Sequence, residues 1–211
     1  KLDQVKFSPL LSDHKAVSMA RVGYGSMNKV YLQWENAFWE PKTAAEPSPH
    51  VLLWLNDQSD GRLSIAVNYN VVVPHSNILC LMVTGESGPL IEDLTDAEII
   101  DEALSILRKA YGSSIEPPCN SLITRWSKDK WSGGSYSSLV LGSTHDDLKK
   151  LGESEGRVHF AGEHTAVEYL GSVHGAYFSG IRAATEVLTA MGKPAPAPHK
   201  IYEPTGDLSE E

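Results

Sequence analysis

Residues 157–184, RVHFAGEHTAVEYLGSVHGAYFSGIRAA, carry the pattern with the most chemical content in the chain. An apolar segment stops at Gly162 and Glu163, a polar loop follows, and a helical pattern starts near Ser172. The Glu163 carboxylate could accept hydrogen bonds from ribose-type hydroxyls. Unpaired N–H groups at the helix start, at Ser172, Val173 and His174, could hold an anion or an electron-rich ring edge. Because α/β folds set ligands in this way, the pattern predicts a ligand site; the alternative is close helix–sheet packing without a ligand.

The same stretch contains glycines at Gly171, Gly175 and Gly180. Each glycine lowers helix stability by roughly 1 kcal/mol relative to alanine. Gly171 and Gly175 are four residues apart, as are Ala176 and Gly180, so small residues line faces of the helix. This pattern indicates that something large approaches the helix backbone.

Three aromatic residues, Trp126, Trp131 and Tyr136, recur five residues apart across a loop that contains Gly133 and Gly134. The faces of aromatic rings attract positive charge and can shape an apolar slot for a substrate nitrogen. The alternative, strongest for Trp126, is that these rings simply pack in the core.

Other kinds of site have weaker support. The segment Gly23–Asn28 lacks the third glycine of a dinucleotide-binding loop, and residues 133–137 lack the second glycine of a nucleophile elbow. The eight histidines show no metal-ligand spacing, and His174 is interpreted as a structural residue. Cys80 and Cys119 are too few for a disulfide framework or a zinc cluster, and we expect both thiols to be buried.

The elements that must position these residues begin with a strand after the glycines at 23 and 25. Its residues alternate between two faces, with Val30, Leu32 and Trp34 on one and Lys29, Tyr31 and Gln33 on the other. Further strands are expected at 51–55, 64–73, 77–83 and 121–126, and the strand at 77–83 is expected to be buried on both faces.

The clearest helix covers residues 94–112. Thr95 and Glu98 form a capping box at its start, and Gly112 ends it. Its expected core stripe consists of Ile100, Leu104, Leu107 and Tyr111. Residues 142–156 are interpreted as a polar connection with one helical turn, and 158–161 as a strand.

Composition sets broad limits on function. The chain has 211 residues, a net charge of -9, and hydrophobic and charged fractions of 41% and 21%, typical of one or two globular domains. An acidic chain lacks the basic footprint of a nucleic-acid-binding protein and suits a cationic substrate. No apolar run is long enough for a membrane span. The chain starts at Lys1, so we expect a piece of a longer protein.

Three blocks of the sequence resemble the flavin amine oxidase family, which includes polyamine oxidases, monoamine oxidases and lysine-specific histone demethylases. They are GYGSMNKVYLQWENAFW, ITRWSKDKWSGGSYSSLVLGST and HFAGEHT…YLGSVHGAYFSGIRAA, in the family's order, and together they span most of residues 1–190. Residues 42–115 match only in general pattern. The family's dinucleotide fingerprint has no counterpart, so the resemblance implies that an N-terminal half, as a partner segment, supplies the pyrophosphate-binding wall.

The implied fold is mixed α/β: part of a two-domain FAD-dependent amine oxidase, with a mixed-sheet substrate domain and the C-terminal strand–helix return of a Rossmann-like FAD-binding domain. We expect a partial substrate-binding domain over 1–120 and a strand and loop lining the flavin and substrate cavity over 121–155. The C-terminal part of the FAD-binding domain covers 156–191, and an extended tail covers 192–211.

The resemblance also implies which residues bind FAD. Glu163 matches the acidic residue that contacts the sugar chain of FAD, and Gly162 and Gly171 belong to the same cofactor-binding segment. The backbone of Ser172 and Val173 matches the pair that meets the pyrimidine side of the flavin. There the helix dipole would favour the negative charge of reduced flavin by about 0.3–1 kcal/mol.

Two catalytic residues are implied. Lys29 matches the lysine that holds a water at flavin N5 and takes part in the reaction with oxygen; the alternative is an exposed strand lysine. Tyr136 matches one wall of an aromatic cage for the amine. Trp126 and Trp131 belong to the cofactor wall, with the Trp131 position packing beside the isoalloxazine ring.

Ser172 and Tyr169 are the remaining substrate-site candidates. Monoamine oxidases have a second cage tyrosine where this chain has Ser172, so the small residue is more similar to polyamine oxidases and histone demethylases. Tyr169 could offer another aromatic wall.

The expected activity is FAD-dependent oxidation of an amine, with a polyamine as first choice and O₂ as acceptor, giving an aldehyde and hydrogen peroxide. The alternatives are a histone-lysine demethylase of the same family and a flavin-free relic of the fold that binds a partner. We favour a cytoplasmic location, since the Ser-Glu-Glu C-terminus lacks the peroxisomal Ser-Lys-Leu signal.

Overall fold

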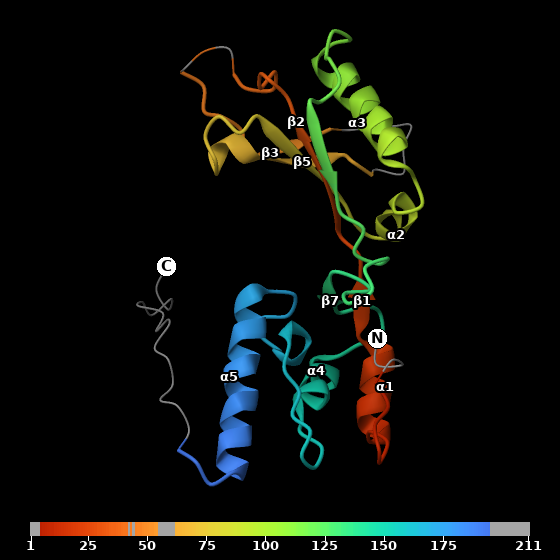
Figure 1. The fold of residues 1–211 in the computed structure, drawn as a ribbon, viewed down its shortest axis with the longest axis vertical. Helices are drawn as coiled ribbons and strands as arrows, with labels where there is room; N and C mark the ends of the chain where they lie inside the picture. The colour runs from red at the N-terminus through yellow and green to blue at the C-terminus, as the bar shows by residue number, and fades with distance from the viewer. Residues whose placement is uncertain (1–4, 42, 44, 55–61, 195–211) are drawn as a thin grey trace. The chain divides into compact units, whose positions relative to one another are not determined.

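The computed structural model describes residues 5–41, 43, 45–54 and 62–194, and the chain divides into two compact units (Figure 1). The sheet unit contains Lys1–Phe7 and Gly23–Val140, and the helical unit contains Ser8–Val22 and Leu141–Glu211. The unit boundaries therefore fall near residues 22 and 140, inside the predicted segments 1–120 and 121–155. The predicted tail lies mostly at 195–211, outside the described residues.

The sheet unit is built on a five-stranded sheet in the order β3-β4-β5-β2-β6, with every neighbouring pair antiparallel. The strands are β2 (Asn28–Gln33), β3 (Val51–Leu53), β4 (Ile65–Asn68), β5 (Ile78–Val83) and β6 (Asn120–Ile123). A separate antiparallel pair joins β1 (Gly23–Gly25) to β7 (Tyr136–Ser138).

The alternation predicted for β2 is confirmed. Val30 and Leu32 are fully buried and Trp34 is buried beside them, whereas Lys29 is only partly buried on the other face. Strand β5 differs from its prediction: Leu79, Leu81 and Val83 are buried in the core and Cys80 is buried on the outer face, but Ile78 and Met82 stay partly exposed.

Strand β4 ends five residues earlier than predicted. The side chain of Asn68 accepts a hydrogen bond from the Asn70 N–H at 3.1 Å, and this cap turns the chain into the 3-10 helix η2 (Tyr69–Val71). The local hydrogen bond competes with the sheet ladder and wins here.

Helix α3 (Asp96–Tyr111) covers the core face of the sheet together with the short helix α2 (Ser87–Ile91), as Figure 1 shows. The capping box and the stop at Gly112 are confirmed. The predicted stripe is partly wrong, because the helix is rotated about its axis: Leu104 and Leu107 are buried, but Ile100 is half-buried and Tyr111 is exposed. The other buried residues of α3 are Ile99, Ala103 and Ile106.

The helical unit contains α1 (Asp13–Arg21), α4 (His145–Gly152), the 3-10 helix η3 (Glu163–Thr165) and α5 (Val173–Ala190). Helix α4 is longer than the single predicted turn, because Thr144 and Asp147 form a capping box at its start. The predicted strand at 158–161 is wrong. Among the described residues, this segment has no neighbouring strand, and only a bridge between Glu155 and Val158 forms.

Helix α1 was not predicted, although Ser12 caps it through the Lys15 N–H. Lys15 joins α1 to the end of α4. Its side chain is 2% exposed, and its ammonium donates to the carbonyls of Lys150, Leu151 and Glu153 at 2.7, 2.9 and 2.8 Å. These contacts explain why residues 8–22 pack with the C-terminal part of the chain.

Glu186 on α5 links the loop before η3 to the helix. It accepts hydrogen bonds from Ser154 at 2.6 Å and from Arg182 at 2.8 Å, and its carboxylate lies 3.1 Å from His159 Nδ1. The Ser154 hydrogen bond, with help from His159 and Arg182, lowers the pKa of Glu186 to about 2 despite partial burial.

A group whose folded-state pKa is depressed stabilises the fold above its unfolded pKa and loses that contribution as the pH falls. We therefore expect wild-type stability to decline between about pH 4.5 and 2, and Glu186→Gln to flatten that part of the profile. Urea midpoints measured across this range would test this. Glu153→Gln, the same change at an exposed position nearby, serves as the control, and identical slopes in wild type and Glu186→Gln would contradict the expectation.

Candidate functional site

The ten candidate residues divide between the two units. Lys29, Trp126, Trp131 and Tyr136 belong to the sheet unit, and Gly162, Glu163, Tyr169, Gly171, Ser172 and Val173 belong to the helical unit. Each group is described within its own unit.

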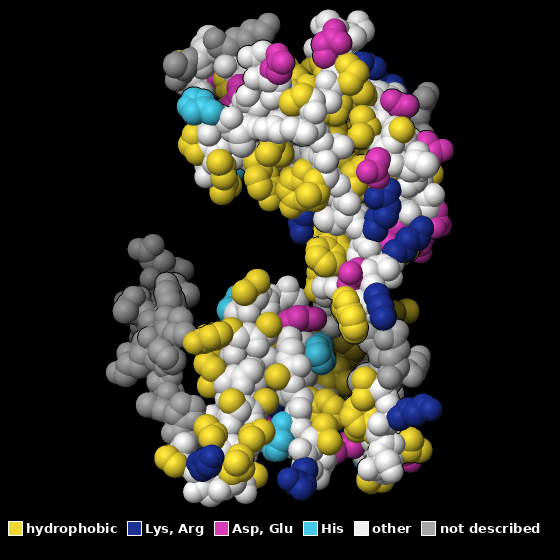
Figure 2. Space-filling model, in the orientation of Figure 1, with side chains coloured by type: hydrophobic (Ala, Val, Ile, Leu, Met, Phe, Trp, Pro, Cys, Tyr) yellow, Lys and Arg dark blue, Asp and Glu magenta, His cyan; other side chains and the backbone are white. Residues whose placement is uncertain are grey.

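Lys29 lies on the face of the sheet that is turned away from the core. Its direct cross-strand partner is Met82, and Tyr31 two residues further on pairs with Cys80. This outer face is largely apolar, with exposed side chains at Val51, Leu53, Ile65 and Leu122. Figure 2 shows that the charged side chains of this unit gather on the side of α2 and α3. Lys29 is therefore a partly buried cation on an open apolar surface.

Two groups beside Lys29 are held neutral. Burial raises the pKa of the Cys80 thiol, although the Tyr31 hydrogen bond and Lys29 act in the opposite direction. Burial also raises the pKa of Tyr31, and its hydrogen bond with Tyr69, 3.4 Å between the hydroxyl oxygens, adds to the shift. Neither Cys80 nor Tyr31 therefore places a negative charge beside Lys29. Of the two cysteines, Cys119 is exposed rather than buried, as it precedes the edge strand β6.

The aromatic loop after β6 is exposed. Trp131 is 79% exposed, with Lys130 Nζ 4.8 Å from its ring centre, whereas Trp126 and Tyr136 are 37% and 36% exposed. The core alternative is therefore wrong for Trp131; Trp34 and Trp39 fill the core instead.

Glycine is required in this loop at Gly134. Its φ of +149° disfavours other residues, and a Cβ there would meet the Tyr24 ring at 2.3 Å. Tyr136 follows on β7, opposite Gly25. The close packing of the loop on Tyr24 thus determines where Tyr136 begins its strand.

In the helical unit, the start of α5 forms an exposed turn. Ser172 is the N-cap residue, and its hydroxyl accepts from the Gly175 N–H at 3.0 Å. The Ser172 N–H itself donates to the Tyr169 carbonyl at 3.2 Å, so the prediction that it is unpaired is wrong. The N–H groups of Val173 and His174 have no intrahelical acceptor, and the Val173 side chain is 88% exposed.

Two of the three glycines of this segment, Gly171 and Gly175, have a reason other than the one predicted. A Cβ at Gly175 would lie 2.2 Å from the Tyr169 carbonyl, so the close approach comes from the chain's own turn. Gly171 has a φ of +71°, in the left-handed region. Gly180 has open space around it.

Glu163 lies beside this turn. Its Oε2 accepts a hydrogen bond from the Gly171 N–H at 2.7 Å, which joins η3 to the residues just before α5. Gly162, the residue before Glu163, has a φ of +138° and donates its N–H to Ser179 on α5 at 2.9 Å. One acidic side chain and the open end of an 18-residue helix are thus brought together.

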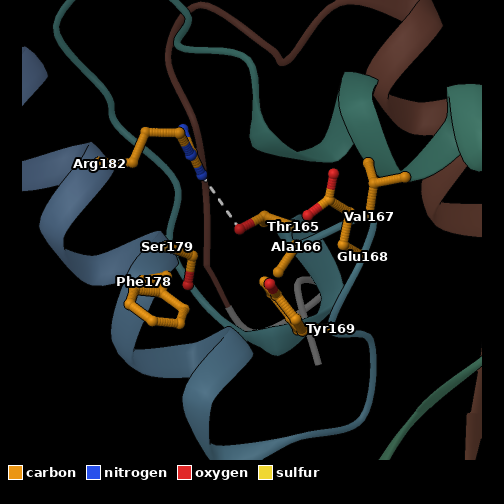
Figure 3. Close-up of a pocket in the computed structure, with 8 residues that line it drawn as sticks. All are labelled: Thr165, Ala166, Val167, Glu168, Tyr169, Phe178, Ser179 and Arg182. Carbon is orange, nitrogen blue, oxygen red and sulfur yellow. Dashed lines mark hydrogen bonds between the residues drawn. The ribbon is translucent and has the colours of Figure 1, made fainter. Parts of the chain in front are cut away.

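Tyr169 packs along α5. Its ring centre lies 4.8 Å from that of His174 and 5.8 Å from that of Phe178. Figure 3 shows Tyr169 and Phe178 at a cavity of about 260 Å³, across which Arg182 donates to Thr165 Oγ1 at 3.0 Å. The direction of Tyr169, which sequence alone did not give, is toward this helix.

The model of the family described as "Flavin containing amine oxidoreductase" matches residues 1–188. The chain belongs to the flavin-containing amine oxidoreductase family. The predicted mixed α/β fold is confirmed. The prediction that the chain forms part of the two-domain amine oxidase fold is confirmed as well. The cofactor of this family is FAD.

Named relatives of this amine oxidoreductase chain include "Possible lysine-specific histone demethylase 1" of Drosophila melanogaster, 35% identical over 93% of this chain and 23% of the relative. "Histone demethylase-like protein A" of Aspergillus fumigatus is 31% identical over 100% of this chain and 20% of its own length. The chain thus spans about a fifth to a quarter of these relatives.

Solved structures agree on the fold. Cyclohexylamine oxidase from Brevibacterium oxydans has a TM-score of 0.73 at 22% identity, covering 91% of this chain and 41% of that one. A redesigned putrescine oxidase has a TM-score of 0.72 at 19% identity, covering 89% of this chain and 40% of that one.

The residues present fit part of FAD. Helix N–H groups at Val173 and His174 suit the electron-rich pyrimidine edge of a flavin, and a carboxylate such as that of Glu163 suits sugar-chain hydroxyls. Within the described ranges, no cluster of His, Cys, Asp and Glu could hold a metal ion. None of the described helices has the length and hydropathy of a membrane span.

Proposed function

We propose that this chain is part of an FAD-dependent amine oxidase whose substrate is a methylated lysine side chain. The observation that carries the choice of substrate is the 35% identity to a possible lysine-specific histone demethylase over 93% of the chain. The cyclohexylamine and putrescine oxidases, at 22% and 19% identity, support only the fold. The sequence alone favoured a polyamine as the substrate and kept methylated lysine as an alternative. Here methylated lysine becomes the first choice.

The helical unit supplies contacts to the cofactor. The N–H groups of Val173 and His174 would hold the pyrimidine edge of the flavin, and Glu163, oriented by the Gly171 N–H, would accept hydrogen bonds from hydroxyls of the sugar chain. Gly162 and Gly171 give the turns that bring these groups together. The positive end of the α5 dipole favours the negative charge that reduction adds.

The sheet unit supplies the groups for the amine and for oxygen. Tyr136 presents a ring face that attracts and orients the substrate nitrogen, and Trp126 and Trp131 add to the cofactor wall. Lys29 holds a water molecule and assists the reduction of O₂.

The chemistry balances without a strong protein base. Bound FAD would supply the two-electron acceptor for the hydride on the carbon attached to the substrate nitrogen. The amine becomes an imine, and water hydrolyses this to an aldehyde and a shorter amine; O₂ takes the two electrons and two protons and leaves as hydrogen peroxide.

Polyamine oxidation is the second candidate function. It is favoured by Ser172, a small residue whose hydroxyl is occupied in capping α5, and by a net charge of -9, which suits a polycation. A flexible polyamine and a lysine side chain both place an amine at the end of an extended aliphatic chain.

Peroxide release by the full-length protein would test the proposal. We expect turnover of a dimethyl-lysine peptide and none of the trimethylated peptide, because a quaternary nitrogen has no lone pair with which to form an imine. Spermine, spermidine and their N-acetylated forms test the second candidate, and simple monoamines complete the panel. A purified protein without visible flavin absorbance would contradict both functions and favour a flavin-free relic.

A further inference from the structure

A buried polar pair, Asn28 and Glu92, adjoins both Lys29 and the loop that carries Trp126. Asn28 is 0% exposed and Glu92 is 3% exposed. Burying an amide and a carboxylate costs free energy unless hydrogen bonds replace those lost from water. The hydrogen-bond partners of these two side chains therefore show what the pair holds in place.

Glu92, the residue after α2, binds two successive N–H groups of the loop. Its Oε1 accepts from the Ser127 N–H and its Oε2 from the Lys128 N–H, both at 2.9 Å. Burial alone would raise the pKa of Glu92, but hydrogen bonds from Asn28, Ser127 and Lys128 outweigh it and leave the pKa below its ordinary value. The carboxylate is therefore ionised while it holds the loop.

Asn28 connects this carboxylate to the strand and to Trp126. Its Nδ2 donates to Glu92 Oε1 at 2.6 Å and to the Gly88 carbonyl at 2.9 Å. Its Oδ1 accepts from the Trp126 N–H and from the Thr124 hydroxyl, both at 3.1 Å. The Asn28 amide thus donates to α2 through its nitrogen and accepts from the loop through its oxygen.

Thr124 extends the connection to Lys29. The Lys29 N–H donates to Thr124 Oγ1 at 2.8 Å, and the Thr124 N–H donates to the Lys29 carbonyl at 3.0 Å. The backbone of Lys29 and that of Trp126 are therefore related through two side chains, Asn28 and Thr124.

Helix α2 must approach closely for this arrangement. A Cβ at Gly88 would meet the Ser26 carbonyl oxygen at 2.3 Å, so a larger residue would push α2, and Glu92 with it, away from Asn28. The Ser26 hydroxyl completes the cluster, donating to Glu92 at 3.1 Å without touching the loop.

We infer that Asn28 and Glu92 are positioning residues that hold Lys29 and Trp126 in the relative arrangement that amine oxidation needs. This rests on the proposed function. The pair itself touches neither substrate nor cofactor; it acts through the backbone of the loop and of β2. A merely structural pair would affect stability but not the rate of flavin reduction in the folded, flavin-loaded enzyme.

Asn28→Asp in the full-length protein gives a test that reports on geometry. The introduced carboxyl group, when protonated, can donate to Glu92 and accept from the Trp126 N–H, as Asn28 does, whereas two ionised carboxylates repel. Sharing a proton raises one pKa of such a pair. The charged neighbours are Lys128, whose ammonium donates to the Glu92 carbonyl at 2.7 Å, and Asp93 beside it.

The readout is amine-driven flavin reduction per bound flavin, measured by stopped flow at saturating substrate. We expect Asn28→Asp to resemble wild type at the acid end and to lose rate by roughly 10-fold or more as this proton dissociates. Wild type and the control Ser26→Ala, which removes a hydroxyl from the cluster but no bond to the loop, should lack the extra step in their pH profiles.

A constant ratio of Asn28→Asp to wild type across the pH range would overturn the inference. If Asn28→Asp does not fold, Glu92→Gln is the second variant, because the glutamine NH₂ group would face an N–H of the loop and could not accept from it. An unchanged rate of flavin reduction per bound flavin in Glu92→Gln would also overturn the positioning role. A wild-type protein that binds FAD but is reduced by no amine would overturn the proposed function and this inference with it, whereas an active wild type with unaffected variants overturns the inference alone.

Discussion

Replacing Lys29 with methionine should slow the reaction of reduced flavin with O₂ on the order of 100-fold while FAD stays bound, as expected for loss of a positioned charge. Methionine keeps the length and apolar character of the side chain, so the sheet should be unaffected. The ammonium lies on an apolar face, beside neutral Tyr31 and Cys80, where its charge acts more strongly than in water. Stopped-flow reoxidation of the amine-reduced, full-length protein measures the effect.

The matched control is Lys109→Met, the same substitution in the last turn of α3. It should leave reoxidation at the wild-type rate. Flavin content must be equal in all three proteins. If Lys29→Met and wild type reoxidise at the same rate, Lys29 has no part in the oxygen reaction and the alternative of a simple strand lysine stands.

Replacing Lys15 with methionine should lower the free energy of unfolding by roughly 3 kcal/mol, because the change leaves carbonyl groups at a buried helix end without a donor. The ammonium of Lys15 supplies three hydrogen bonds there and lies 3.9 Å from the centre of the Phe160 ring. We expect the urea midpoint to fall and residues 8–22 to become sensitive to protease at lower urea concentrations.

Lys150→Met provides the comparison for that measurement. Lys150 forms an i,i+4 ion pair with Asp146 at 2.6 Å on the surface of α4, and such pairs contribute about 0.2–0.5 kcal/mol. Equal losses of stability in the two variants would show that the buried ammonium of Lys15 contributes no more than a surface charge.

Sequence patterns correctly predicted those elements that are determined by residues close together in the chain. The alternation of β2 and the capping box of Thr95 and Glu98 follow from neighbouring residues, and both are present as expected. The strand predicted at 158–161 is absent for the converse reason: an apolar run becomes a strand only when another strand pairs with it, and the described part of the helical unit offers none.

The roles of the candidate site residues stay predictions, and the sequence did not indicate the contacts among them. Spacing drew attention to Trp131 and Tyr136, and exposure of Trp131 fits a role outside the core. Asn28 and Glu92 escaped notice because they are 64 positions apart in the chain, and Glu92 is 35 positions from Ser127. The signal that could have found Asn28 is its place in β2: a polar residue in register with Val30 and Leu32, on the buried face.

The glycines near α5 show how a correct pattern can have another cause. Gly175 is required, but by the carbonyl of Tyr169 rather than by a ligand. A distance between backbone atoms cannot be derived from residue spacing along a helix, so the sequence alone could not separate these reasons.

The ladder between β1 and β7 sets Gly23 opposite Ser138, so the chain departs from the helical unit and re-enters it at neighbouring points. Residues 23–140 make up most of the sheet unit, so excising them together with residues 1–7 and joining residue 22 to 141 with a short linker should preserve the hydrogen bonds described between α1 and α4. The same junction would accept a sheet unit from another enzyme while the contacts among α1, α4 and α5 stay in place.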